Sequence, residues 1–167
     1  MNDESRGEAL GGPGMEARLG LGLPEIAHPC YNLLMSTLRV NFQLPLPPSI
    51  NQQYATVDGR RVLSETSRAY KQAVLRQIQQ LRRSGAISEA FIAQAQAGYL
   101  ALFIDFYFET PLRRDLDGGL KIAQDAICAG LETDDRRVVD IHLVKRTDRG
   151  SPRIEVELEA LPAWQFS

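Results

Sequence analysis

The sequence predicts a mixed α/β domain of the α+β type, in which helices pack on a small mixed sheet. Apolar and polar residues alternate over 37–44, an apolar-rich run spans 100–108, an amphipathic stripe spans 64–83, and two further candidate strands occupy 138–145 and 153–160. Alternation is typical of strands, whereas apolar spacings of three and four residues are typical of helices. The 167 residues, 44% of them hydrophobic, are enough for one domain with a hydrophobic core.

Residues 1–34 differ from the rest because they are rich in Gly, Pro and Glu and lack sustained periodicity. Such a composition is typical of segments that do not pack into a core. We therefore expect residues 1–34 to be a disordered or loosely attached extension and residues 35–167 to form the domain. Met35 directly precedes the first predicted strand and is a candidate for the natural start.

The first predicted strand covers residues 37–44. It ends at Pro45, because proline has no backbone N–H to donate to a neighbouring strand. Gly59 marks a turn, and residues 60–63 are expected to form either a short strand or an ordered loop.

Two helices are expected next. The first begins at Ser64 or Thr66, either of which can cap it, and ends near Arg83. The second covers residues 88–97 and ends at Gly98. A buried strand then spans 100–108.

A third helix is expected from Gly118 to about Ala129, with Asp117 as its N-cap and Gly130 as its stop. The last two strands, 138–145 and 153–160, flank a turn and therefore predict an antiparallel hairpin. The predicted order is β-α-α-β-α-β-β.

Two acidic pairs are the candidate site. If residues 115–117 are extended, Asp115 and Asp117 fall on one face, because strand side chains alternate. Lys121 follows them, and Asp134 and Asp135 form the second pair. Arginines flank both pairs: Arg113, Arg114, Arg136 and Arg137. Mg²⁺ is usually held by one or two carboxylates, water and substrate phosphate. This pattern predicts a site where a metal ion and a phosphodiester meet.

Charge and composition exclude several classes of protein. The net charge is −2; two of the 19 basic and five of the 21 acidic side chains lie in residues 1–34, which leaves 17 against 16. This balance argues against a broad cationic surface but allows a local group of basic residues around the acidic site. The sequence contains no membrane span, secretory signal or nucleotide-binding fingerprint. Cys30 and Cys128 form no zinc or disulfide pattern, so we expect a reducing, cytoplasmic setting.

At the acidic motif the sequence resembles the RusA family of Holliday junction resolvases, the crossover junction endodeoxyribonucleases. That family has a Pro-Pro-Ser-x-Asn segment after its first strand, then Arg-Asp-Leu-Asp-Asn-x-x-Lys, an Asp-Ala pair in the following helix, and a later acidic pair. The matching residues here are Pro47-Pro48-Ser49-Ile50-Asn51, Arg114 to Lys121, Asp125-Ala126 and Asp134-Asp135. One position departs from the pattern, because Gly118 stands where the family has Asn.

The resemblance implies a Mg²⁺-dependent homodimeric endonuclease, with Mn²⁺ as a substitute ion, that nicks four-way DNA junctions symmetrically in recombination and repair. It implies that Asp115, Asp117 and one of Asp134 and Asp135, with Asp135 preferred, bind the metal. Lys121 and Arg114 would face the scissile phosphate. Further expected DNA contacts are Arg113, Arg136, Arg137, Arg60 and Arg61.

Simpler interpretations of these residues stay open. Lys121 is four residues after Asp117 and could form only an ion pair with it. Asp117 could be a cap, a ligand or both, and Asp134 and Asp135 could be an acidic surface turn. Asp125 is expected to have a structural role.

Two other functions also remain. A non-cleaving junction-binding protein would keep the fold and lose the chemistry, with Gly118 as its sign. A metal-dependent phosphohydrolase of small substrates would fit the near-neutral charge.

Overall fold

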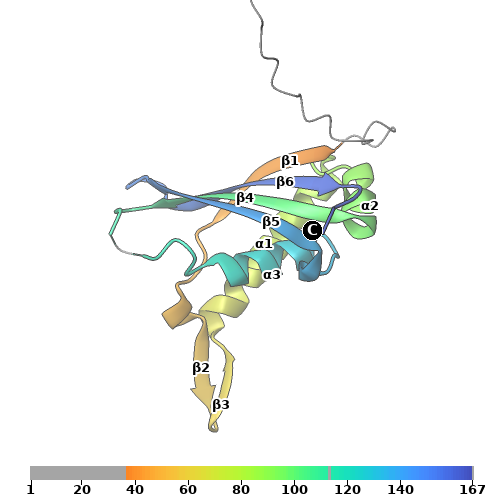
Figure 1. Ribbon diagram of the computed structural model, residues 1–167. Coiled ribbons are helices and arrows are strands. Elements are labelled where there is room, and N and C mark those ends of the chain that lie inside the picture. Colours follow the sequence, from red (N-terminus) through yellow and green to blue (C-terminus); the bar gives the residue numbers. More distant parts are fainter. Residues whose placement is uncertain (1–36, 113, 167) are drawn as a thin grey trace, which may run out of the picture. The chain divides into compact units, whose positions relative to one another are not determined.

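The computed structural model describes residues 37–112 and 114–166 and confirms a mixed α+β fold (Figure 1). The expected extension, residues 1–34, lies outside the described residues, as does Arg113. The elements in chain order, with η for a 3-10 helix, are β1 Leu38–Pro45, η1 Ile50–Gln52, β2 Tyr54–Val57, β3 Arg60–Leu63, α1 Glu65–Arg83, α2 Glu89–Ala97, β4 Tyr99–Phe108, α3 Leu120–Gly130, η2 Asp135–Arg137, β5 Val138–Thr147 and β6 Arg153–Leu161.

Strand β4 lies inside the main sheet, whose order is β1-β6-β4-β5. It pairs antiparallel with β6 and parallel with β5, and β6 pairs antiparallel with β1. The predicted hairpin between the last two strands is therefore wrong, because β4 lies between them. The connection from β5 to β6 crosses the end of β4, where Asp148 N donates to the carbonyl of Phe108 at 2.8 Å. The even-numbered side chains of β4 are all buried and belong to the core between the sheet and the helices.

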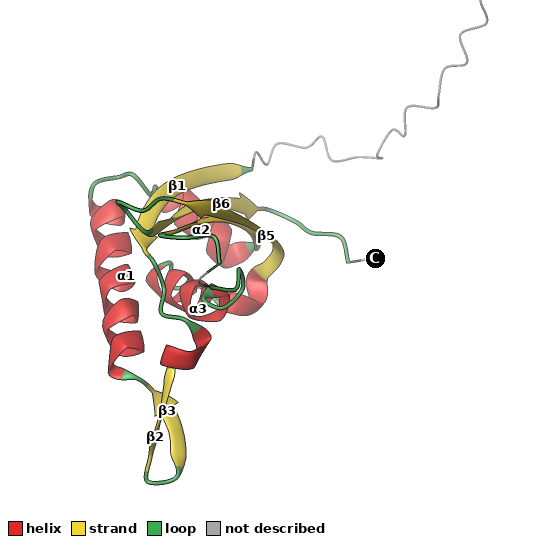
Figure 2. Cartoon of the chain, turned by 90° about the vertical axis from the view of Figure 1, so that its left-hand side faces the viewer, coloured by secondary structure: helices red, strands yellow, loops and turns green. Residues whose placement is uncertain are grey.

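The helices α1, α2 and α3 cover one face of this sheet (Figures 1 and 2). Helix α1 begins after Ser64, whose Oγ accepts a hydrogen bond from Ser67 N at 3.1 Å, as the sequence predicts. Its stripe of Tyr70, Val74 and Ile78 is buried in the core between helices and sheet. The helices therefore hold the sheet from one side and leave its other face open.

Strands β2 and β3 form a separate two-stranded hairpin that projects beyond α1 (Figure 2). Its turn is Asp58-Gly59, and both residues have positive φ, 49° and 72°, as a two-residue type I′ turn requires. The predicted order lacks β2. All four β2 residues are exposed, so no alternation of buried and exposed positions marks the strand.

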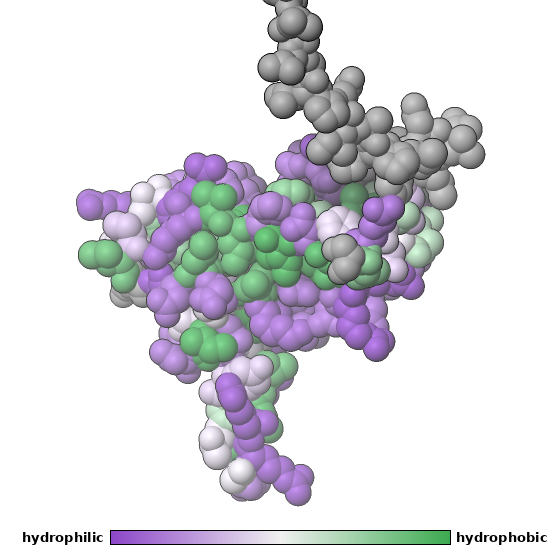
Figure 3. All heavy atoms as spheres, in the orientation of Figure 1, coloured by the Kyte–Doolittle hydropathy of each residue, from purple (hydrophilic) through white to green (hydrophobic). Residues whose placement is uncertain are grey.

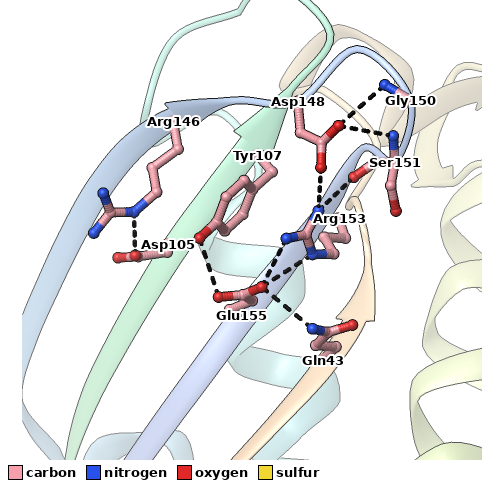
Figure 4. Close-up of polar contacts among 9 residues, drawn as sticks. All are labelled: Gln43, Asp105, Tyr107, Arg146, Asp148, Gly150, Ser151, Arg153 and Glu155. Atoms are coloured by element: carbon pink, nitrogen blue, oxygen red, sulfur yellow. Dashed lines mark hydrogen bonds and ion pairs between the residues drawn. The ribbon is translucent and has the colours of Figure 1, made fainter.

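The open face of the main sheet carries a polar network (Figure 4). Asp105 on β4 accepts from Arg146 on β5, and Glu155 on β6 accepts from Tyr107 Oη at 3.1 Å. Arg153 lies over the Tyr107 ring, 4.0 Å from its centroid, and donates to Glu155 at 2.8 Å. The charges of this face therefore pair largely with one another.

Apolar side chains reach the surface along the edge strand β5. Ile141 is 38% exposed and Val144 is 42% exposed. Figure 3 shows hydrophobic residues gathered across the middle of this side of the molecule. Among the described residues, no helix has both the length and the apolar composition that crossing a membrane requires.

Candidate active site

The candidate site starts from the loop between β4 and α3. Leu116 and Asp117 lie in a bend, so residues 115–117 are not the extended segment considered from the sequence. Gly118 N donates to the carbonyl of Asp115 at 3.4 Å, and Leu120 N donates to that of Asp117 at 2.9 Å. Leu116 packs against the core, whereas Asp115 and Asp117 are exposed. Within the described part of the chain, neither carboxylate has a hydrogen-bond or ion-pair partner, so both are available to a ligand.

The predicted cap role of Asp117 is wrong. Helix α3 begins at Leu120, its N-cap is Gly119, and no side chain caps it. The cause is packing, because a β-carbon on Gly119 would lie 2.5 Å from Cγ of Pro47. Only glycine allows this close approach of the loop to the segment that follows β1. Asp117 contributes its carbonyl to the turn, and its carboxylate pairs with no described residue.

A cleft of about 570 Å³ lies between this loop and residues 46–52. Arg114 closes one side, where its Nη1 donates to the carbonyl of Pro47 at 2.7 Å. The cleft is lined by Leu46, Pro47, Ser49, Ile50, Asn51, Gln52, Phe106, Phe108, Glu109, Arg114, Asp115, Gly118, Gly119 and Pro152. The two motifs that the sequence analysis singled out, far apart in the chain, therefore form one surface.

Lys121 occupies the first turn of α3 and has two acidic partners. Its Nζ lies 2.8 Å from Oδ1 of Asp125 and 2.5 Å from Oδ2 of Asp135. These contacts, Asp125 first, raise the pKa of Lys121. The ion pair with Asp117 considered from the sequence is not formed. Asp117 lies before the helix, whereas Asp125 lies within it, one turn after Lys121. The ammonium therefore pairs with Asp125 and not with Asp117.

The two residues of the second acidic pair, Asp134 and Asp135, have different partners. Asp134 accepts from the backbone N of Arg136 at 2.9 Å and pairs with its guanidinium at 2.6 Å. The Arg136 side chain holds the pKa of Asp134 well below its usual range. Asp135 instead faces Lys121, and its carbonyl accepts from Gln124 Nε2 at 3.2 Å. Asp135 is thus the member of the pair that lies against α3.

The predicted DNA-contacting arginines lie in different environments. Arg137 donates to the carbonyls of Ala97 and Gly98 at the end of α2, at 3.2 and 2.8 Å. The Arg136 side chain is 87% exposed. Arg60 and Arg61 lie on the hairpin, with the Arg61 guanidinium 3.9 Å from the centroid of the Tyr54 ring.

Lys145 and Gln53 also belong to this region, although the sequence analysis did not assign them to it. Lys145 Nζ donates to the carbonyl of Arg114 at 2.6 Å, and Gln53 Nε2 donates to that of Gly118 at 2.9 Å. Both bind backbone carbonyls far away in the chain. No spacing in the sequence signals such contacts.

The carboxylates are not gathered into a complete cage. Among residues 37–112 and 114–166, no three His, Cys, Asp or Glu side chains lie close enough to hold a metal ion together. Asp115 and Asp117 still fit the chemistry of Mg²⁺, which commonly uses one or two protein carboxylates and takes its other ligands from water and phosphate. Asp135 would have to leave Lys121 to join them.

Comparison with known proteins agrees with this arrangement. The model of the family described as "Endodeoxyribonuclease RusA" matches residues 45–159, which include the cleft, Lys121 and both acidic pairs. The crossover junction endodeoxyribonucleases RusA of Shigella sonnei strain Ss046 and Escherichia coli strain K12 are each 33% identical over 116 residues, covering 69% of this chain and 89% of the relative. That of Enterobacteria phage 82 is 32% identical over 116 residues, with the same coverage. The chain therefore belongs to the RusA endodeoxyribonuclease family.

Proposed function

We propose that the protein is a Mg²⁺-dependent, structure-selective endodeoxyribonuclease that resolves four-way DNA junctions by paired nicks in recombination and repair. The observation that carries this proposal is the carboxylate pair of Asp115 and Asp117, which has no partner among the described residues and lies on a loop that borders an open cleft. Membership of the RusA family supports the same activity, since its curated members are named for crossover junctions.

The proposed metal ligands are Asp115, Asp117 and Asp135, in preference to Asp134, which Arg136 holds. A bound Mg²⁺, or Mn²⁺ in its place, would lower the pKa of a water molecule and polarise a phosphoryl oxygen. Asp115 and Asp117 would supply the negative charge that such an ion needs. They have no competing cation among the described residues, so binding would not first have to break an ion pair there.

Lys121 would stabilise the negative charge that develops on the phosphate. Its second partner, Asp125, would hold the ammonium at the first turn of α3 if Asp135 turned to a metal ion. Asp125 therefore has a positioning role in this proposal, consistent with the structural role expected from the sequence.

The proposed phosphate contacts are Arg113, Arg114, Arg136, Arg137, Arg60 and Arg61. Arg114 borders the cleft, and the hairpin arginines are exposed. Arg137 already has two carbonyl acceptors and is therefore a weaker candidate than the exposed Arg60 and Arg61. The open face of the sheet is an unsuitable DNA surface, because β6 alone places Glu155, Glu157 and Glu159 there. DNA would therefore approach the loop and hairpin.

The proposed functional unit is a homodimer on branched DNA. Symmetric nicking of a four-way junction needs two sites, and one chain offers one set of the proposed residues. The molecular mass in solution, by light scattering with and without junction DNA, tests this. A monomer in both conditions would contradict it.

A non-cleaving junction-binding protein is the second candidate. The observation in its favour is that no three potential metal ligands of the described chain lie close together, while Asp135 pairs with Lys121. This function needs the same DNA surface and no metal chemistry.

The decisive experiment is cleavage of a synthetic four-way junction in Mg²⁺ and in Mn²⁺ by the wild type and by Asp117→Asn. Paired nicks by the wild type, lost in Asp117→Asn while junction binding persists, are the expected result. Binding without nicks in either ion would favour the second candidate. Absence of both binding and nicks would exclude the two junction functions. A small-substrate phosphohydrolase would then be tested with bis(p-nitrophenyl) phosphate.

A further inference from the structure

Gln53 is a buried polar residue between η1 and the hairpin, and its side-chain N–H groups are bound inside the protein. It is 2% exposed. Its Nε2 donates to the carbonyl of Pro48 at 3.1 Å and to that of Gly118 at 2.9 Å. A buried amide must satisfy its donors, and here both go to backbone carbonyls of two different segments.

The backbone of Gln53 is fixed as well. Its N donates to the carbonyl of Ile50 at 3.3 Å, and its carbonyl accepts from Ser64 N at 2.9 Å. Ser64 Oγ also donates to the carbonyl of Gln52 at 2.6 Å. Gln53 therefore stands at the base of the hairpin, between the start of β2 and the N-terminus of α1.

The candidate catalytic loop is attached to one segment at both of its ends. Arg114 binds the carbonyl of Pro47 before the two aspartates, and Gln53 binds the carbonyl of Gly118 directly after them. Gly119 also packs on Pro47 in this segment. Among the described residues, the backbone at 118–119 would keep no hydrogen bond to residues 47–53 without the Gln53 amide.

We infer that Gln53 is a positioning residue: its side-chain amide fixes the Asp115–Asp117 loop to the segment after β1 and to the base of the hairpin. The inference rests on the proposed function, because it gives the loop a defined geometry for phosphodiester cleavage. A displacement of about 1 Å at such a site can cost about 100-fold in rate. Junction binding is expected to change less than cleavage, because Arg114 keeps its own hydrogen bond to Pro47 and Arg60 and Arg61 are held by the hairpin strands.

The test compares Gln53→Met, which keeps the side-chain length and removes both N–H donors, with Gln96→Met. Gln96 is a matched control, because its Nε2 also donates to two backbone carbonyls, those of Leu131 and Glu132, each at 3.3 Å. These lie after α3, away from the loop. The first readout is amide hydrogen exchange of residues 115–120, with no metal or DNA present. The second is kcat and KM for junction cleavage.

Gln53→Met is expected to exchange faster at residues 115–120 and to lose about 100-fold in kcat, with KM within twofold of the wild type. Gln96→Met is expected to match the wild type in both. Unchanged exchange in Gln53→Met, or an equal loss in both variants, would overturn the inference. If the wild type does not cleave, the proposed function fails, and the exchange data still decide the role of Gln53. If Gln53→Met does not fold, Gln53→Asn, whose shorter amide cannot span both carbonyls, takes its place in the same comparison.

Discussion

Lys121 and Asp135 form an ion pair in which Nζ lies 2.5 Å from Oδ2. Both residues belong to the proposed site. The carboxylate of Asp135 is the partner of Lys121 and also a proposed metal ligand. Asp135 cannot hold the ammonium this closely and also give its charge fully to a metal ion. Lys121 has Asp125 as a second acceptor at 2.8 Å, so it can release Asp135 without losing every partner. Metal binding would therefore compete with Lys121 for Asp135.

The first prediction follows from this competition. Lys121→Met is expected to slow junction cleavage by about 100- to 1,000-fold, because a donor that stabilises transition-state charge is lost. The same change is expected to tighten Mn²⁺ binding, measured by calorimetry, because Asp135 is released. Arg82→Met is the control: it breaks a comparable pair, Arg82–Glu132 at 2.8 Å, outside the site. Weaker Mn²⁺ binding in Lys121→Met would contradict the competition.

Two adjacent glycines should respond differently to a side chain. A β-carbon on Gly118 would meet only Asp115 atoms, at 3.5 and 4.0 Å, whereas one on Gly119 would lie 2.5 Å from Pro47 Cγ. We expect Gly118→Asn to keep the stability and the cleavage of the wild type. Gly119→Ala should lower the free energy of unfolding by about 1–3 kcal/mol, as overpacking does, and reduce cleavage.

Urea unfolding and junction cleavage of both variants check this prediction. The residue at Gly118 also bears on the second candidate function, which takes the missing Asn as a sign of lost chemistry. Cleavage gained only in Gly118→Asn would support that view. Equal cleavage would show that glycine at this position is not the limiting factor.

The hairpin gives the third prediction. Arg60→Ala/Arg61→Ala should weaken junction binding and lower the slope of log Kd against log salt by about one unit per lost phosphate contact. Both residues are exposed, so the fold should be unaffected. Arg39→Ala is the control, because Arg39 lies on the acidic open face and pairs with Glu159 at 2.5 Å. A salt slope equal to that of the wild type would remove the hairpin from the DNA surface.

The sequence predicted the parts of this fold that depend on local patterns. The strand over 100–108 and the helix capped by Ser64 follow from alternation and a capping side chain, and both are confirmed. Strand pairing does not follow from such patterns. The last two strands are neighbours in sequence, yet β4 separates them in the sheet. Strand β2 was missed because it buries no side chain.

Local patterns in the sequence likewise identify the residues of the site but not the contacts between them. The acidic motif and the Pro47–Asn51 segment were identified one by one, but their contact across the cleft depends on the fold. The start of α3 was placed two residues too early, since nothing local shows that Pro47 packs on Gly119. That shift in turn changes the partner of Lys121 from Asp117 to Asp125. One long-range contact thus altered two assignments.

Cys128 on α3 gives a prediction about pH. Its side chain is buried, and this burial, together with the nearby charges of Asp135 and Asp125, raises the pKa of the thiol to about 12. In the unfolded chain a thiol has a pKa of about 8.5. Between these values the unfolded state releases a proton that the folded state keeps, so stability falls as pH rises. The stabilising contribution is complete below about pH 8.5.

At pH 10, the ionisation of this one thiol lowers the free energy of unfolding by about 2 kcal/mol. The measurement is urea unfolding from pH 7.5 to 10 in a Cys30→Ser background, so that Cys128 is the one thiol that titrates. The comparison is with Cys128→Ala in the same background, which lacks this group and should lose about 2 kcal/mol less over the same range. Parallel pH dependence of the two proteins would mean that the thiol of Cys128 titrates alike in the folded and unfolded states, contrary to its burial on α3.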